Sequence, residues 1–379
     1  MSKIKDITTL CKAGQLTEAY EKAKNDLQAT PSDVWARREV GWVLYYMLKA
    51  DTHSHDSQAF LAHLEEFVRL DALTVQDTLL FESILWSIGN FIRQLPKNQL
   101  EDVQRIFSLL DSYTFAPSKA YSYLLKAFLG FKQWNGLAAF IDWWNLDNLL
   151  PEDYIPFKTD QGNSIISLGE QAYIAYSRAL LTMHDKNKIS SFIPKLEELT
   201  DKYPDMTYPG YFCGKLMLSM GTVQEEALQM VMPFVRKKQK EFWVWQLLGD
   251  VYKSDSYTQL ACYLRAVHCK TKEDFLGKVR LKLVSLYFAR RDYGRARFQL
   301  DILIKNYKQN GWNIPDEAWS YAQEPSIQNA VADKSDGLDY RQITRPILYL
   351  GSNESLAAAA YVNAAQKYGI IVYGETMIS

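Results

Sequence analysis

Two short stretches of the chain combine basic and aromatic side chains, the combination that holds single-stranded nucleic acid. Basic side chains pair with phosphates, and aromatic rings stack on unpaired bases. The stretch "VRKKQKEFWVW" presents Arg236, Lys237, Lys238 and Lys240. The stretch "YFARRDYGRARF" presents Arg290, Arg291, Arg295 and Arg297. We predict these residues as nucleic-acid contacts; the alternative is that they cover solvated helix faces.

The basic residues are concentrated in one part of the chain. The whole sequence has a net charge of −1, but residues 236–308 contain 17 Lys and Arg against 7 Asp and Glu. This block therefore carries a net charge of +10 and the remainder carries −11. Such a block can attract nucleic acid or another anionic partner. The favoured interpretation of the block as a whole is a set of solvated helix faces.

The common catalytic signatures are missing from the sequence. It has no G-x-G-x-x-G after a strand, no G-x-x-x-x-G-K-[ST], no H-E-x-x-H and no G-x-S-x-G. His53 and His55 stand near Asp51 and Asp56, an arrangement that could hold a transition metal. A polar connector between helices is the favoured interpretation, because no other ligand cluster supports a metal site. We expect a protein that is not an enzyme and that carries no metal or cofactor.

The elements that must position these side chains are predicted to be helices. One unit contains Trp245, Leu248, Gly249 and Tyr252, and the next contains Tyr287, Ala296, Leu300 and Leu303. Large residues at this spacing share one helix face, and the glycine lets a neighbouring helix approach closely. Tyr252 and Tyr287 are 35 residues apart, close to a 34-residue repeat period.

These residues resemble the tetratricopeptide repeat (TPR) superfamily over roughly residues 205–308, and the N-terminal residues 1–48 resemble it as well. The resemblance implies helix pairs stacked into a right-handed solenoid that binds a protein partner. Between these parts, apolar residues at three- and four-residue spacing predict further helices without the regular period. We expect an all-α fold, a degenerate TPR-like right-handed helical solenoid, followed by a short C-terminal β-hairpin.

Polar stretches suggest where this architecture is interrupted. Residues 145–164 predict a long loop. The polar, poorly periodic sequence after Gln323 predicts a linker. We therefore predict a helical-repeat domain over 1–322, a linker over 323–345 and a hairpin region over 346–379.

The sequence "AAAAYVNAAQKYGIIVYGE", residues 357–375, differs from the helical part. One interpretation is two strands joined by a turn. The other is a strand over 346–351, a helix over 354–368 and a strand over 369–375, because alanine favours helix. A third is an accessory tail.

A resemblance to the hairpin of a known fold supports the first interpretation, two strands joined by a turn. Tyr361, Val362 and Asn363, followed by Lys367, Tyr368, Gly369, Ile370 and Ile371, resemble the first hairpin of a cold-shock type oligonucleotide-binding (OB) barrel. The resemblance implies that Tyr361, Lys367 and Tyr368 contact single-stranded RNA or DNA, although Ile370 stands where a stacking Phe is usual. A complete barrel has five strands, so we expect the hairpin to be the opening of a barrel that is cut short at Ser379.

The combination is similar to bacterial proteins of mobile-element conflict or defence systems, which join a TPR-like region to nucleic-acid-binding barrels. The resemblance implies a scaffold that binds a protein partner and contacts single-stranded RNA or DNA. The alternative is a protein–protein interaction module without nucleic-acid binding.

Features of composition bear on where the protein works. No apolar run approaches the ~18 residues of a membrane span, and the first residues lack the pattern of a signal peptide. The four cysteines are scattered and form no C-x-x-C pair. We expect free thiols and a cytoplasmic protein that has no membrane partner.

Overall fold

The computed structural model describes residues 2–70, 73, 75, 77–158, 162, 164–221, 224–350, 357–362, 369–373 and 376–378. The fold is all-α with a short β region at the C-terminal end, as predicted from the helical spacing of apolar residues. The chain divides into two compact units, residues 1–212 and 213–379. This boundary falls inside a helix, α11 (Pro209–Met220).

The first unit is a succession of helices with two very short strands. Its elements are α1 (Ser2–Lys12), α2 (Leu16–Ala29), α3 (Val34–Ser54), α4 (Ser57–Val68), α5 (Thr78–Gln94), α6 (Leu100–Leu110), α7 (Lys119–Phe128), α8 (Leu137–Trp144), η1 (Leu146–Asn148), η2 (Pro151–Tyr154), β1 (Phe157–Lys158), β2 (Ser164–Ile165), α9 (Leu168–Met183) and α10 (Lys186–Lys202).

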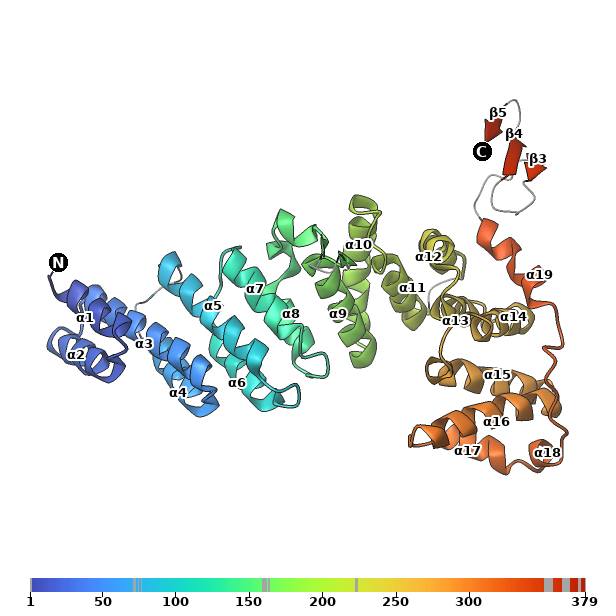
Figure 1. Ribbon diagram of the computed structural model, residues 1–379, viewed down its shortest axis with the longest axis horizontal. Coiled ribbons are helices and arrows are strands. Elements are labelled where there is room, and N and C mark those ends of the chain that lie inside the picture. The colour runs from blue at the N-terminus through green and yellow to red at the C-terminus, as the bar shows by residue number, and fades with distance from the viewer. Residues whose placement is uncertain are drawn as a thin grey trace. The chain divides into compact units, whose positions relative to one another are not determined.

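Local sequence signals set the starts of many of these helices. Asp33, Asp56 and Asp77 each accept a hydrogen bond from a backbone N–H in the first turn of α3, α4 and α5. Such caps satisfy donors that a helix end leaves unpaired. The helices then pack in sequence, with α3 against α4 and α5, and α5 against α7 (Figure 1).

Aromatic side chains fill the core around α6, α7 and α8. Phe128 stacks on Phe140 with ring centroids 4.0 Å apart, and Tyr121 stacks on Trp144 at 4.7 Å. The indole N–H of Trp144 donates to the carbonyl of Tyr121 at 3.1 Å. The large apolar area of these rings, with their polar atoms paired, stabilises this part of the unit.

The second unit begins with helices and ends with short elements. Beyond the end of α11, it contains α12 (Gln224–Lys238), α13 (Phe242–Val251), α14 (Ser256–Val267), η3 (Glu273–Phe275), α15 (Gly277–Ala289), α16 (Tyr293–Gln309), α17 (Asp316–Gln323), α18 (Pro325–Gln328), α19 (Tyr340–Thr344), η4 (Pro346–Tyr349), β3 (Ala357–Val362), β4 (Gly369–Tyr373) and β5 (Thr376–Ile378).

Two helix pairs form the centre of the second unit, α13 with α14 and α15 with α16. Both pairs correspond to the repeat units expected from the sequence. A Cβ atom at Gly249 would lie 2.2 Å from the ring of Tyr263 on α14. The close approach predicted for this glycine is thus confirmed, because any larger residue would force the two helices apart.

The segment from α18 to η4, residues 325–350, lies along these helices and is called the strap below. It includes most of the residues predicted as a linker. The strap contacts α16 through α18 and contacts α14 through α19. The N–H of Asp333 donates to the carbonyl of Gly294 at 3.0 Å, and the hydroxyl of Tyr287 donates to the carbonyl of Asp336 at 2.8 Å.

The last strands form an antiparallel sheet in the order β3-β4-β5. Ala357 pairs with Tyr373 and Val362 pairs with Gly369. The prediction of two paired strands is confirmed. Residues 364–368, most of the predicted turn, lie outside the described residues. The strand–helix–strand alternative is wrong, because residues 357–362 form a strand and 346–349 form a 3₁₀ helix. Alanine favours helix by only a few tenths of a kcal/mol over most residues, so pairing with a neighbouring strand can override it.

Among the described residues, no helix is both long and apolar enough to cross a bilayer.

Candidate anion-binding groove

A groove in the second unit lies where the strap meets the C-terminal end of α14. Its volume is about 550 Å³. Three segments supply its walls: the turn between α12 and α13, the end of α14, and the strap from α19 to η4. The lining residues are Gln239, Lys240, Arg265, His268, Cys269, Lys270, Tyr340, Arg341, Arg345, Leu348 and Tyr349. We call it the basic groove.

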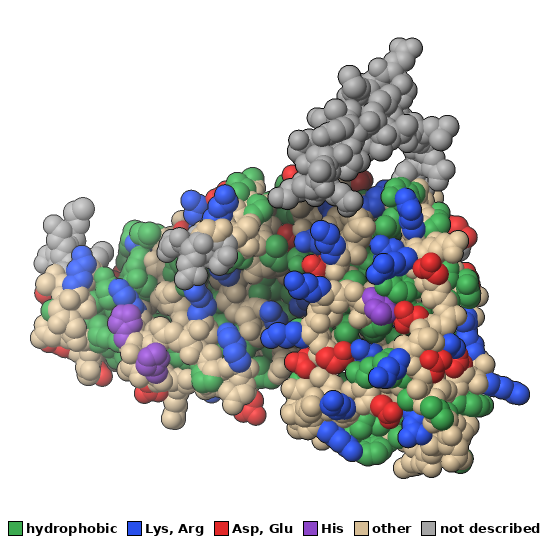
Figure 2. Space-filling view, turned by 45° about the vertical axis from the view of Figure 1, so that its right-hand side comes forward, with side chains coloured by type: hydrophobic (Ala, Val, Ile, Leu, Met, Phe, Trp, Pro, Cys, Tyr) green, Lys and Arg blue, Asp and Glu red, His purple; other side chains and the backbone are tan. Residues whose placement is uncertain are grey.

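The groove is basic because of which residues face it. Five Lys and Arg line it, and among its described lining residues there is no Asp or Glu. On the face of the molecule that Figure 2 shows, Lys and Arg side chains are interspersed with Asp and Glu. A concave surface of one charge sign concentrates its field and attracts ions of the opposite sign.

Arg265 connects the groove to the core of the unit. Its guanidinium lies 3.8 Å from the ring centroid of Trp245, a fully buried side chain on α13. It also donates to the hydroxyl of Thr344 on α19 at 2.8 Å. Burial lowers the pKa of Arg265, but an arginine keeps its charge at any physiological pH. A fixed positive charge therefore stands at the base of the groove.

Aromatic rings add flat surfaces to these charges. His268 stacks on Tyr340 with ring centroids 4.8 Å apart and planes 5° from parallel. Asp336 orients the His268 ring, because a carboxylate oxygen of Asp336 lies 2.9 Å from Nε2 of His268. Tyr349 is 52% exposed. The groove thus offers rings for stacking beside cations for phosphates.

Carboxylates also lie close to the groove, outside its lining. Burial raises the pKa of the lining thiol Cys269, and the charge of Glu241 adds to this. Asp336 is bonded to His268 as described, and Asp339 accepts from the backbone N–H groups of Arg341 and Gln342 at the start of α19. The guanidinium of Arg341 donates to the hydroxyl of Tyr340 at 3.2 Å, and this bond raises the pKa of Arg341. These contacts orient the side chains of His268 and Arg341, and the charge of Asp339 also acts on Arg341.

Of the first predicted basic cluster, only Lys240 lines the groove. Arg236 lies at its edge and donates to the carbonyls of Leu348, at 2.9 Å, and Leu350. It therefore holds the strap in place. Lys237 is exposed and Lys238 half-buried near the end of α12.

The second predicted cluster lies at the turn between α15 and α16, and two of its members hold the strap. Arg297 donates to the carbonyls of Gln328 and Ala330 at 2.6 and 2.7 Å. Arg295 forms ion pairs with Asp292 and Asp333.

The other two members of the second cluster face elsewhere. Arg290 donates to Ser256 at 3.2 Å, and its guanidinium lies 6.0 Å from the ring centroid of Tyr257. Arg291 is exposed and has a left-handed φ of 59°.

The hairpin residues predicted to contact nucleic acid are placed only in part. Tyr361 lies on β3, paired with Ile370 on β4, and the structure describes its backbone alone. Lys367 and Tyr368 lie outside the described residues.

Residues 207–346 match the model of a protein family described as a domain of unknown function, DUF7017. A comparison with curated proteins gives no match. The matched segment contains every residue that lines the basic groove except Leu348 and Tyr349. The chain is therefore similar to that family in the region where the groove lies.

Most of the residues that line the basic groove were not predicted from the sequence. Arg341 and Arg345 stand four residues apart, a spacing that places both on one side of a short helix. This signal was available, but the polar sequence around it predicted a linker. Arg265, His268 and Lys270 join them only through the packing of α19 on α14.

The histidines considered as metal ligands lie at a helix end. His53 is in the last turn of α3 and His55 caps it with a left-handed φ of 58°. The described residues include no group of three or more His, Cys, Asp or Glu placed to hold a metal ion.

Proposed function

We propose that the chain is a non-enzymatic helical adaptor that binds a protein partner and contacts single-stranded RNA or DNA through the basic groove. The observation that carries the nucleic-acid half is the lining of that groove. It combines five cations with a histidine and two tyrosines, and its described lining contains no carboxylate. Phosphates need the cations, and unpaired bases need the flat rings.

The protein-binding half rests on exposed aromatic side chains in the first unit. Trp35 on α3 is 60% exposed and Trp86 on α5 is 40% exposed. Aromatic residues on a surface are frequent anchors in protein interfaces. These residues also favour the second candidate function, a protein-interaction module without nucleic-acid binding.

Two further inferences complete the proposal. The helix pairs α13/α14 and α15/α16, with their repeat residues, support a TPR-like solenoid similar to those of bacterial defence proteins. The four cysteines lie in described parts of the chain and are not joined in disulfides, which supports a cytoplasmic location.

The nucleic-acid half is tested by binding of fluorescently labelled oligo(U) and oligo(dT) to the full chain between 50 and 200 mM salt. Each phosphate neutralised by a cation contributes a slope of about −0.7 in the double-logarithmic salt plot. The variant K240Q/K270Q/R341Q should make the slope less steep, by about 2, and weaken binding at 50 mM salt by at least about tenfold. All three side chains are exposed, so the fold should be unaffected.

The control is K278Q/K305Q/K308Q, which removes the same charge from exposed positions of the second unit outside the groove. It should bind like the unmodified chain. Equal losses in both variants would mean that binding follows net charge and not the groove. No binding of either oligonucleotide at 50 mM salt would leave the protein-interaction module as the function.

A further inference from the structure

We propose that the first unit binds its protein partner through an extended, acidic segment of that partner, held in a groove along α9. This inference deepens the protein-binding half of the proposed function and rests on it. The groove has a volume of about 720 Å³ and lies wholly within the first unit. We call it the α9 groove.

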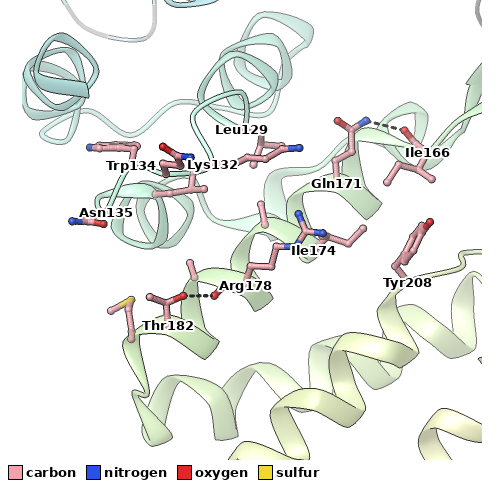
Figure 3. Close-up of a pocket in the computed structure, with 15 residues that line it drawn as sticks. Leu129, Lys132, Trp134, Asn135, Ile166, Gln171, Ile174, Arg178, Thr182 and Tyr208 are labelled. Atoms are coloured by element: carbon pink, nitrogen blue, oxygen red, sulfur yellow. Dashed lines mark hydrogen bonds between the residues drawn. The ribbon is translucent and has the colours of Figure 1, made fainter. Parts of the chain in front are cut away.

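One wall of the α9 groove is a single face of one helix. Gln171, Ile174, Arg178 and Thr182 stand three or four residues apart on α9, and all line the groove. The connection between α7 and α8 forms the opposite wall, with Lys132, Trp134 and Asn135 (Figure 3). Tyr208 closes one end.

The dimensions of the groove suit an extended chain. The stretch from Gln171 to Thr182 covers eleven residue steps, about 16 Å at 1.5 Å per residue. An extended peptide advances about 3.3 Å per residue, so about five residues span the groove.

The charged side chains that line the groove determine which charge the bound segment must carry. Lys132 and Arg178 are its charged lining residues, both exposed and both positive, and no carboxylate is found among the described lining. They come from opposite walls, so one segment can meet both. Arg178 can hold a carboxylate with two parallel hydrogen bonds.

The remaining lining suits the rest of such a segment. Ile174 and Met183 provide apolar surface for alternate side chains. The amides of Gln133 and Asn135 are exposed at the rim and can donate to and accept from peptide groups. Carboxylates beside apolar residues are therefore the expected content of the bound sequence.

The walls are preorganised, which lowers the entropic cost of binding. The indole N–H of Trp134 donates to Gln104 at 3.1 Å, and a Cβ atom at Gly136 would lie 2.4 Å from the indole. The amide of Gln171 donates to the carbonyl of Ile166 at 2.8 Å. Arg178 lies with its guanidinium 5.4 Å from the ring centroid of Phe212.

The test is a selection of random heptapeptides displayed on phage against the immobilised full chain. The selected peptides should be enriched in Asp or Glu next to apolar residues. Synthetic copies of them, labelled with fluorescein, should lose about tenfold or more in affinity for K132E/R178E. A selection against that variant should instead enrich Lys and Arg, a reversal that unfolding could not produce.

Two comparisons separate the α9 groove from the basic groove. The variant K240Q/K270Q/R341Q should keep its affinity for the selected peptides, and K132E/R178E should keep its affinity for oligonucleotides. The proposal is overturned if the selection enriches no acidic peptide, or if the peptides bind K132E/R178E as well as the unmodified chain. Loss of peptide binding in the basic-groove variant alone would also overturn it, because the peptides would then occupy the other site. Failure of oligonucleotide binding would leave this result untouched.

Discussion

A half-buried pair of side chains, His63 and Asp51, joins α3 to α4. Nδ1 of His63 lies 2.7 Å from a carboxylate oxygen of Asp51, and the two side chains are 22% and 12% exposed. The bond to Asp51 raises the pKa of His63, while burial acts in the opposite direction. The net shift is upward, so the folded chain binds the proton more tightly than the unfolded chain does.

This pair should make the stability of the protein depend on pH. Its contribution is fully present below the ordinary histidine pKa of about 6.5 and is lost as pH rises through the raised value. In urea unfolding from pH 5.5 to 9, the advantage of the unmodified chain over H63Q should be largest at the acid end. The other four histidines are present in both proteins, so their contributions to the difference cancel. An advantage that is constant across this range would contradict the assignment.

The contacts of a residue can be predicted from the sequence where one helix sets its environment, and cannot where two distant segments do. The role of Gly249 follows from spacing alone, since Gly249 and its neighbours share one helix. The role of Arg297 does not, because its acceptors are carbonyls of Gln328 and Ala330. Every residue has a backbone carbonyl, so the sequence does not show which carbonyls accept hydrogen bonds from Arg297. Arg297 was therefore predicted to bind phosphate.

At the scale of elements, the close packing of α13 against α14 depends on glycine at position 249, which has no side chain. Alanine is a better helix former than glycine by about 1 kcal/mol, so G249A would stabilise an isolated helix. Here the added methyl group meets the ring of Tyr263, and overpacking of this kind costs about 1–3 kcal/mol. Urea unfolding should show a net destabilisation, and the effect should shrink in a Y263L background. Equal effects in both backgrounds would exclude the ring as the cause.

The strap should loosen when Arg297 is removed. R297A deletes two charge-assisted hydrogen bonds, each worth about 1.5–3 kcal/mol. Amide hydrogen exchange over residues 328–336 should rise by at least about tenfold, while exchange in α13 and α14 stays the same. The matched control is R290A, because Arg290 contacts Ser256 and Tyr257 on α14. A similar rise in both variants would mean that the strap is not held by Arg297.

Element-level prediction shows the same limit. The helical segments and the two strands β3 and β4 follow from local sequence patterns. The strap was predicted as a linker because its sequence is polar and lacks a period. Its order comes from α14 and α16, and the basic groove exists only because of that docking.

At the scale of the whole molecule, the two units should respond separately to destabilisation. A Cβ atom at Gly89 would lie 2.6 Å from the ring of Tyr123 in the first unit, as one at Gly249 would clash in the second. Calorimetry of the full chain should resolve two transitions, with G89A lowering the Tm of one and G249A that of the other. A single transition lowered by both variants would mean that the chain unfolds cooperatively as one body.

The carbonyl acceptors of Arg297 also govern which changes the strap tolerates. Every amino acid supplies a carbonyl, so substitutions at Gln328 and Ala330 preserve both hydrogen bonds as long as the backbone keeps its path. Val331 beside them is 87% exposed. Residues 328–331 can therefore change in sequence, and with it the surface that they show to solvent, while Arg297 keeps both hydrogen bonds to the strap. Homologous chains could diversify this surface at little cost in stability.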